Sequence, residues 1–96
     1  METSEVVPGQ LVRSISGRDV NRYFLVLKAL DQKHLLITDG LYRKVEKPKK
    51  KKLKHIEVID SVAKDIGEML QKGKTPTNAQ AASAVQQMLV NLELGS

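Results

Sequence analysis

The segment YFLVLKALDQKHLLITDG, residues 23–40, contains two consecutive strand patterns that are apolar on both faces. In the first pattern, Tyr23 to Leu30, both sets of alternating positions are mostly apolar, and the second, His34 to Thr38, repeats this character. A strand with two apolar faces has to be covered on both sides. The sequence therefore predicts two neighbouring strands that lie between an inner core and a second apolar layer.

Shorter strand patterns flank this segment on either side. Residues 11–15 form a first strand pattern, and Asp39 with Gly40 predicts a type I′ turn into a further strand, Leu41 to Val45. Leu53 and the apolar positions of residues 56–59 predict a fifth strand. Five short strands separated by frequent turns predict a small, strongly bent antiparallel barrel, because an open sheet of this size would leave long edges.

The last third of the chain changes to a helical period. Asp60 or Ser61 is expected to cap a first helix that ends at Gly73, and residues 77–80 form a capping box for a second helix that runs to about Leu92. These helices would cover the outer faces of the strands, and a homodimer through the helices is the alternative use of the same apolar surface. The predicted organisation is a flexible tail at 1–7, a barrel at 8–59 and a helical pair at 60–96.

One short run carries most of the positive charge. Residues 43–54, RKVEKPKKKKLK, hold eight of the sixteen basic residues against one acid, whereas the remaining 84 residues sum to −2. Because Pro48 cannot donate to a ladder, Lys49 to Lys52 are expected in a loop or at a sheet edge. Such concentrated charge predicts a polyanionic partner, and a solvated loop is the alternative interpretation.

Composition excludes several other classes of function. The 96 residues form one small domain without cysteine, and the two histidines, His34 and His55, have no further ligands at metal-binding spacing. Glycine-rich phosphate-binding fingerprints are absent, and the N-terminus has no signal-peptide pattern. The sequence therefore predicts a cytoplasmic protein that is not an enzyme and that uses neither a cofactor nor a metal.

Several separated segments together resemble the KOW motif, and more narrowly the bacterial KOW-domain RNA-binding proteins related to large-subunit ribosomal proteins of the fourteen-e type. The matching segments are Gly17-Arg18-Asp19, Arg22-Tyr23-Phe24, Asp39-Gly40 and much of residues 43–55, within a resemblance that covers about Val7 to His55. It implies an SH3-like barrel that binds RNA in a ribosomal setting. One departure is that Val20 and Asn21 stand where KOW motifs usually have a glycine, although asparagine also tolerates left-handed backbone.

The expected partner is structured RNA, most simply ribosomal RNA. Lysine outnumbers arginine twelve to four, and the three aromatics are Tyr23, Phe24 and Tyr42, of which Tyr42 is the best candidate to lie outside the core. This favours contacts to the phosphate backbone over base recognition. The alternatives are a transcription-elongation-type KOW factor and a protein-interaction module that uses the barrel edge or the second helix. The candidate KOW-loop residues are Gly17, Asp19 and Asn21, and the candidate RNA-binding residues are Arg18, Arg22, Arg43, Lys44, Lys47, Lys49, Lys50, Lys51, Lys52, Lys54 and His55.

Overall fold

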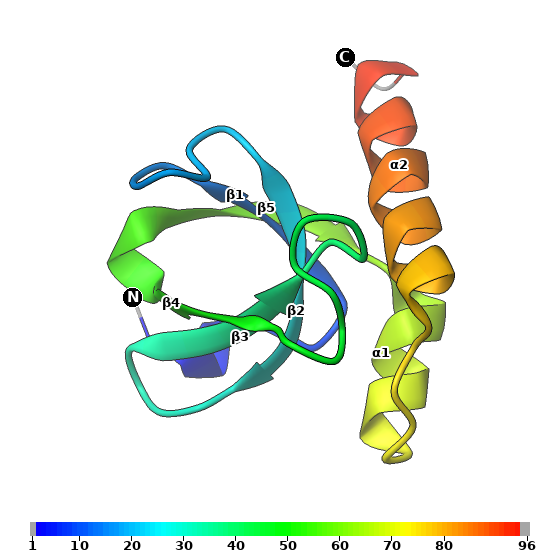
Figure 1. Cartoon of the computed structure of the whole chain (residues 1–96), viewed down its shortest axis with the longest axis horizontal. Coiled ribbons are helices and arrows are strands. Elements are labelled where there is room, and N and C mark those ends of the chain that lie inside the picture. The colour runs from blue at the N-terminus through cyan, green and yellow to red at the C-terminus, as the bar shows by residue number, and fades with distance from the viewer. Residues whose placement is uncertain (1, 95–96) are drawn as a thin grey trace.

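A five-stranded antiparallel sheet followed by two helices makes up the part of the chain that the computed structural model describes, residues 2–94, with side chains to residue 93 (Figure 1). The strand order is β4-β3-β2-β1-β5. The elements are η1 (Thr3–Glu5), β1 (Gln10–Ser14), β2 (Tyr23–Ala29), β3 (His34–Thr38), β4 (Lys49–Lys52), η2 (Leu53–His55), β5 (Ile56–Val62), α1 (Lys64–Gln71) and α2 (Asn78–Leu94).

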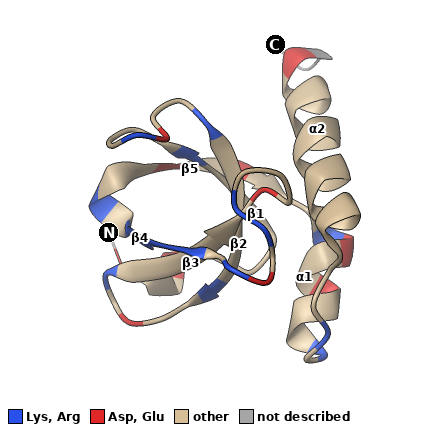
Figure 2. Ribbon diagram, viewed as in Figure 1, with Lys and Arg blue, Asp and Glu red and all other residues tan. Residues whose placement is uncertain are grey.

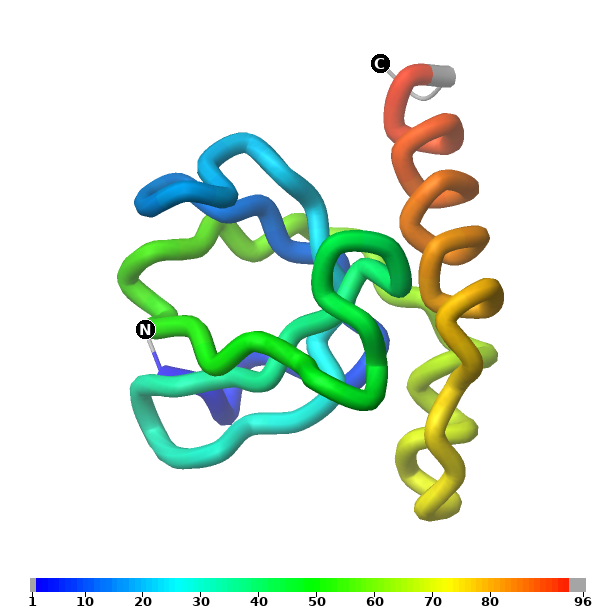
Figure 3. Tube along the Cα trace, viewed as in Figure 1, coloured from blue at the N-terminus to red at the C-terminus, as the bar shows by residue number. Residues whose placement is uncertain are grey.

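The sheet is strongly curled, because its two edge strands follow one another in the chain. Only the three residues of η2 separate β4 from β5, and a 3₁₀ segment of that length spans about 6 Å. In a flat five-stranded sheet the two edges would lie roughly 19 Å apart. The tube in Figure 3 shows the edges brought toward each other around an interior. Register shifts in β1 between Gln10 and Val12, and in β2 between Val26 and Lys28, help the strands to bend.

Two apolar layers lie on opposite sides of β1 and β2. Phe24 and Val26 face the interior of the curl, whereas Leu25 of the same strand faces the helices with Leu11 of β1. The predicted cover on both sides is confirmed for β2, whereas Leu36 on the outer face of β3 is half-buried and belongs to neither layer. The inner layer comprises Val6, Val12, Phe24, Val26, Leu35, Ile37, Leu53 and Ile56, and the buried residues of the outer layer are Leu11, Leu25, Ile66, Ala81 and Met88.

The predicted strand Leu41 to Val45 is wrong, and the fourth strand is β4. Side-chain oxygens accept hydrogen bonds from the backbone N–H groups that such a strand would use for pairing. The Asp39 carboxylate accepts from the N–H of Leu41 (3.0 Å) and of Arg43 (2.9 Å), and Asn78 Oδ1 accepts from the N–H of Val45 (2.8 Å). The turn is not type I′ either, because Gly40 has a positive φ of 73° but Asp39 does not.

The start of the chain also departs from the expectation of a loose tail, although Met1 lies outside the described residues. Thr3 and Val6 are buried, and the Thr3 N–H donates to the carbonyl of Gln32 at 3.2 Å. Val6 joins the inner apolar layer. The segment is therefore held by the β2–β3 turn and by the core.

The first helix begins later than predicted. Asp60 and Ser61 belong to β5, which pairs with β1 as far as Val62, and the Ala63 N–H then donates to the carbonyl of Gly9 at 2.8 Å. Pairing with β1 therefore outweighs the capping preference of the two polar residues. Gly73 ends α1 with a φ of 76°, as predicted.

The second helix begins as predicted. Thr77 Oγ1 accepts from the N–H of Gln80 at 3.0 Å, and Gln80 Oε1 accepts from the N–H of Thr77 at 2.9 Å. These reciprocal bonds are the expected capping box. Residues 95–96 of the predicted helical region lie outside the described residues.

Candidate nucleic-acid interface

The four lysines of β4 are divided between the two faces of the sheet. In the β3–β4 register, Lys51 pairs with Leu35 and Lys49 with Ile37, both of which belong to the inner layer. Residues directly opposite each other in an antiparallel pair project from the same face. Lys49 and Lys51 therefore project inward, and Lys50 and Lys52 project outward. Accordingly, Lys51 is only 6% exposed, whereas Lys50 and Lys52 are exposed.

The inward lysines bind one carboxylate, that of Asp19 in the β1–β2 loop. Asp19 is 5% exposed, and its Oδ2 lies 2.8 Å from Lys49 Nζ, while its Oδ1 lies 2.8 Å from Lys51 Nζ. Ser14 Oγ donates to the same Oδ1 at 2.6 Å. Lys51 Nζ also donates to the carbonyl of Ser16 at 2.8 Å. This group of side chains fastens the loop to β4.

The charges of this cluster determine the pKa of Asp19. Burial by itself favours the protonated acid, but hydrogen bonds from Lys49, Lys51 and Ser14 stabilise the carboxylate and hold the pKa of Asp19 well below its usual range. The two ammonium groups are therefore committed to an internal anion. Two of the candidate RNA-binding lysines therefore have a structural role. Lys51 is buried, and Lys49 is paired with Asp19, so both hold the β1–β2 loop against β4.

The β1–β2 loop adopts the backbone that its sequence predicts. Gly17 has a φ of 91°, and Asn21 has a φ of 70°, so the expectation for Asn21 is confirmed. The Asn21 N–H donates to the carbonyl of Ser14 at 2.8 Å, and Arg13 Nη1 donates to Asn21 Oδ1 at 2.7 Å. Asparagine thus supplies both the left-handed turn and a side-chain bond to β1.

Substitution of Asn21 should separate these two contributions. We expect Asn21→Gly to leave the free energy of unfolding within about 0.5 kcal/mol, since glycine accepts positive φ but loses an exposed side-chain bond. Asn21→Val should cost about 1–2 kcal/mol, because a β-branched residue is strained there. Urea denaturation of the two variants beside wild type measures both values. Equal stability of the valine variant and wild type would contradict the left-handed backbone at this position.

A second contact joins the β1–β2 loop to the loop between β3 and β4. The Arg22 guanidinium carbon lies 3.8 Å from the centroid of the Tyr42 ring. Tyr42 is 68% exposed, as expected for the aromatic outside the core, whereas Phe24 is buried. The candidate residues in the β1–β2 loop and those in the basic run, far apart in sequence, therefore lie side by side.

The N-terminus of α2 fastens the other side of the β3–β4 loop. Asn78 Nδ2 donates to the Glu46 carboxylate at 2.8 and 3.0 Å, while its Oδ1 accepts from the Val45 N–H. The single acid of the basic run is thereby bound to the helix, and it also lines a hollow with Lys44 and Lys47. Sequence inspection could not assign this role to Asn78, because its partners lie about 30 positions earlier.

The exposed cations follow the basic run and the β1–β2 loop. Figure 2 shows basic residues along β4 and the loop before it, and almost no charged residues on α2. Lys33, which lies outside the basic run, lines a hollow of about 400 Å³ with His34, Lys52, Leu53 and Lys54. Because His34 pairs with Lys52, the preceding residue Lys33 lies near the end of β4. The exposed candidates are Arg18, Arg22, Arg43, Lys44, Lys47, Lys50, Lys52 and Lys54.

His55 lies at the end of this run and is half-buried. Burial, together with the positive charges of Lys54, Lys51 and Lys52, lowers the pKa of His55 from its usual value. The imidazole is therefore neutral near pH 7 in the free protein. As a neutral ring it can accept or donate one hydrogen bond beside the lysines.

Lysines on an edge strand also have a purely structural use. They prevent edge-to-edge pairing between molecules, and β4 is an edge of the sheet. This use accounts for Lys50 and Lys52. It does not account for the exposed cations outside the strand, at Arg43, Lys44 and Lys54, which extend the positive surface at both ends.

Comparisons with known proteins identify no family for this chain. Neither the protein-family models nor the curated proteins compared with this chain include a match. Within residues 2–94, no helix is long and apolar enough to cross a membrane. The same residues contain no group of three acidic or histidine side chains that could hold a metal ion.

Proposed function

We propose that this protein binds structured RNA, most simply ribosomal RNA in a ribosome-associated setting, through the phosphate backbone. The observation that carries the proposal is the division of the basic run. Lys49 and Lys51 bind Asp19, and the remaining cations of the run are left exposed around a firmly held loop. Exposed lysines bind phosphate as point charges, and arginines add a bidentate fork.

We infer that the curled sheet is an SH3-like barrel of the KOW type. Three features support it: η2 connects the two edge strands directly, Asp19 fastens the β1–β2 loop to the edge strand β4, and Gly17 and Asn21 both have positive φ. In this proposal the β1–β2 loop is the KOW loop, and Arg18 and Arg22 flank the phosphate-binding surface.

The outward lysines provide the direct test. We expect the double substitution Lys50→Gln and Lys52→Gln to weaken binding to unrelated structured RNAs alike. The slope of log K against log salt concentration should become shallower by roughly 1–2 units, because each phosphate contact that is removed no longer releases counterions from the RNA. Fluorescence anisotropy over a series of salt concentrations measures the slope. Since both side chains are exposed, the melting temperature should stay near that of wild type.

The matched control removes the same charge elsewhere. Lys64 and Lys72 are exposed residues at the two ends of α1, and Lys64→Gln with Lys72→Gln should leave the salt slope nearly unchanged. Equal slopes for wild type and both double variants would show that β4 does not bind phosphate. Its lysines would then serve only to protect a sheet edge.

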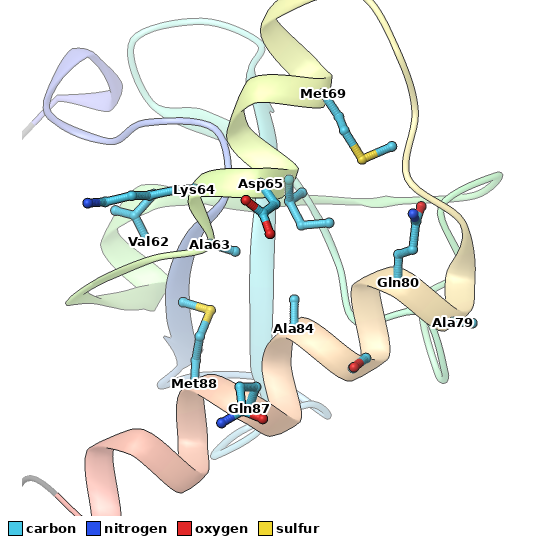
Figure 4. Close-up of a pocket in the computed structure, with 12 residues that line it drawn as sticks. Val62, Ala63, Lys64, Asp65, Met69, Ala79, Gln80, Ala84, Gln87 and Met88 are labelled. Carbon is cyan, nitrogen blue, oxygen red and sulfur yellow. The ribbon is translucent and has the colours of Figure 1, made fainter.

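A protein-binding role is favoured by a different part of the molecule. Apart from Glu93, α2 has no charged residue, and Val90 and Leu92 are 37% and 39% exposed. A groove of about 700 Å³ lies between α1 and α2. Figure 4 shows Met69 of α1 and Met88 of α2 among the side chains that line it. The homodimer predicted through the C-terminal helices would use this apolar surface, and it stays a prediction beside the RNA-binding proposal.

A further inference from the structure

The loop between β3 and β4 presents two large apolar side chains at its tip. Leu41 is 66% exposed and Tyr42 is 68% exposed, and they are the most exposed of the large hydrophobic residues in the described chain. Both lie immediately before the basic run of residues 43–54. A small protein with few aromatic residues leaves one of them in solvent at a cost, since burying its ring would be favourable.

Tyr42 is held in place for a contact. Arg22 lies over its ring at 3.8 Å, which fixes the side chain by a cation–π interaction. A hollow of about 320 Å³ is lined by Tyr42, Arg43, Lys44, Glu46 and Lys47, and Arg22 is not among its lining residues. Tyr42 therefore borders a hollow that is lined by three basic residues and Glu46 and that does not include Arg22.

The backbone that carries Tyr42 is also fixed before any ligand arrives. The buried Asp39 carboxylate binds the N–H groups on either side of Tyr42, at Leu41 and Arg43, and Asn78 anchors the loop to α2 at Val45. A loop ordered in advance loses little conformational entropy on binding. Preorganisation of an exposed aromatic is the arrangement expected of a binding platform.

We propose that Tyr42 stacks on an unpaired nucleobase of the bound RNA, while Arg43, Lys44 and Lys47 bind the phosphates that flank that base. This proposal rests on the proposed RNA binding and adds the kind of RNA element that is recognised. Unpaired bases in loops and bulges are the parts of a folded RNA that can leave the stack and meet an aromatic ring. Phosphate contacts through β4 alone would not distinguish such an element from a plain duplex.

Two RNA hairpins that share one stem and the same tightly stacked tetraloop test the proposal, one fully paired in the stem and one with a single bulged nucleotide as the added unpaired base. Wild type should bind the bulged hairpin more tightly, by roughly five- to hundredfold, which is the usual effect of one stacked base. Tyr42→Ala should abolish this preference and leave the affinity for the paired hairpin nearly unchanged. Tyr42→Phe, which keeps the ring, should retain the preference.

Leu41→Ala is the matched control, since it removes an equally exposed apolar side chain that has no π face. It should preserve most of the preference. A second measurement uses Tyr42→Trp, which introduces the first tryptophan into a chain that has none. Stacking on the bulged base should quench its fluorescence, and the paired hairpin should quench it much less.

The outcomes separate this inference from the proposed function. Wild-type binding of both hairpins with equal affinity, or an unchanged preference in Tyr42→Ala, would overturn the stacking proposal and leave backbone binding intact. Failure of wild type to bind either hairpin would overturn the RNA-binding function itself. Equal quenching of Tyr42→Trp by the two hairpins would likewise contradict recognition of an unpaired base.

Discussion

Asp19→Asn is expected to lower the free energy of unfolding by about 3 kcal/mol at pH 7. Removing one partner of a buried ion pair typically costs 3–5 kcal/mol, because the remaining charge is left in a poorly solvated place. The buried Lys51 ammonium would be in that position, with Asp19 and the Ser16 carbonyl as its present partners. The expected loss is near the lower end of this range, because the Lys49 side chain is 23% exposed and its ammonium group can be solvated after the substitution.

Two variants distinguish this cause from a general effect of lost charge. Glu57→Gln breaks the exposed pair of Glu57 with Arg13, whose atoms lie 3.1 Å apart, and should cost less than about 1 kcal/mol. Adding Lys51→Met to Asp19→Asn should restore part of the stability, since it removes the stranded charge. Urea denaturation measures all of these variants. An Asp19→Asn variant as stable as Glu57→Gln would show that the cluster does not anchor the loop.

The same cluster should respond to acid. Because the pKa of Asp19 is lower in the folded protein than its ordinary value of about 3.9, the folded state binds fewer protons in that range. Its stabilising contribution is complete above about pH 5 and decreases as the pH falls below about 4. The stability difference between wild type and Asp19→Asn should therefore narrow in acid. A difference that is constant from neutral pH to about pH 2 would contradict the ionised cluster.

Gly40→Ala should destabilise the protein by roughly 2–5 kcal/mol. Gly40 has a φ of 73°, which costs an L-residue about 1–2 kcal/mol. A Cβ there would also overlap the carbonyl of Asn78 and press on the N–H of Ala82 at 2.9 Å, in the first turns of α2. Both neighbours are backbone, so α2 would have to shift, and overpacking of this kind costs about 1–3 kcal/mol.

Gly73→Ala is the matched control for the backbone contribution. Gly73 has a similar φ of 76°, but a Cβ there would have no neighbour within 4 Å. Its substitution should cost only the conformational strain of about 1–2 kcal/mol. Thermal and urea denaturation of both variants gives the difference, which isolates the approach of the β3–β4 loop to α2. Equal losses in the two variants would contradict that close packing.

Local preferences in the sequence were enough to predict several elements correctly. Asn21 tolerates positive φ by itself, and residues 77–80 form a capping box whose partners are three positions apart. The two-sided apolar pattern of β2 required two covering layers whatever the connection between them. The edge position of Lys49 to Lys52 followed from Pro48, which cannot serve a central strand. Each of these inferences depends on neighbours in the chain.

Interactions between distant residues were decided only by the tertiary structure. The alternation of buried and exposed lysines in β4 depends on its register with β3 and on Asp19, which lies about 30 positions earlier. The expected strand at Leu41 to Val45 is a loop because Asp39 and Asn78 capture its backbone donors. Four consecutive lysines have the same local preferences. Only the folded chain distinguishes those that bind an internal carboxylate from those left exposed, because burial and charge pairing depend on which segments the fold brings together.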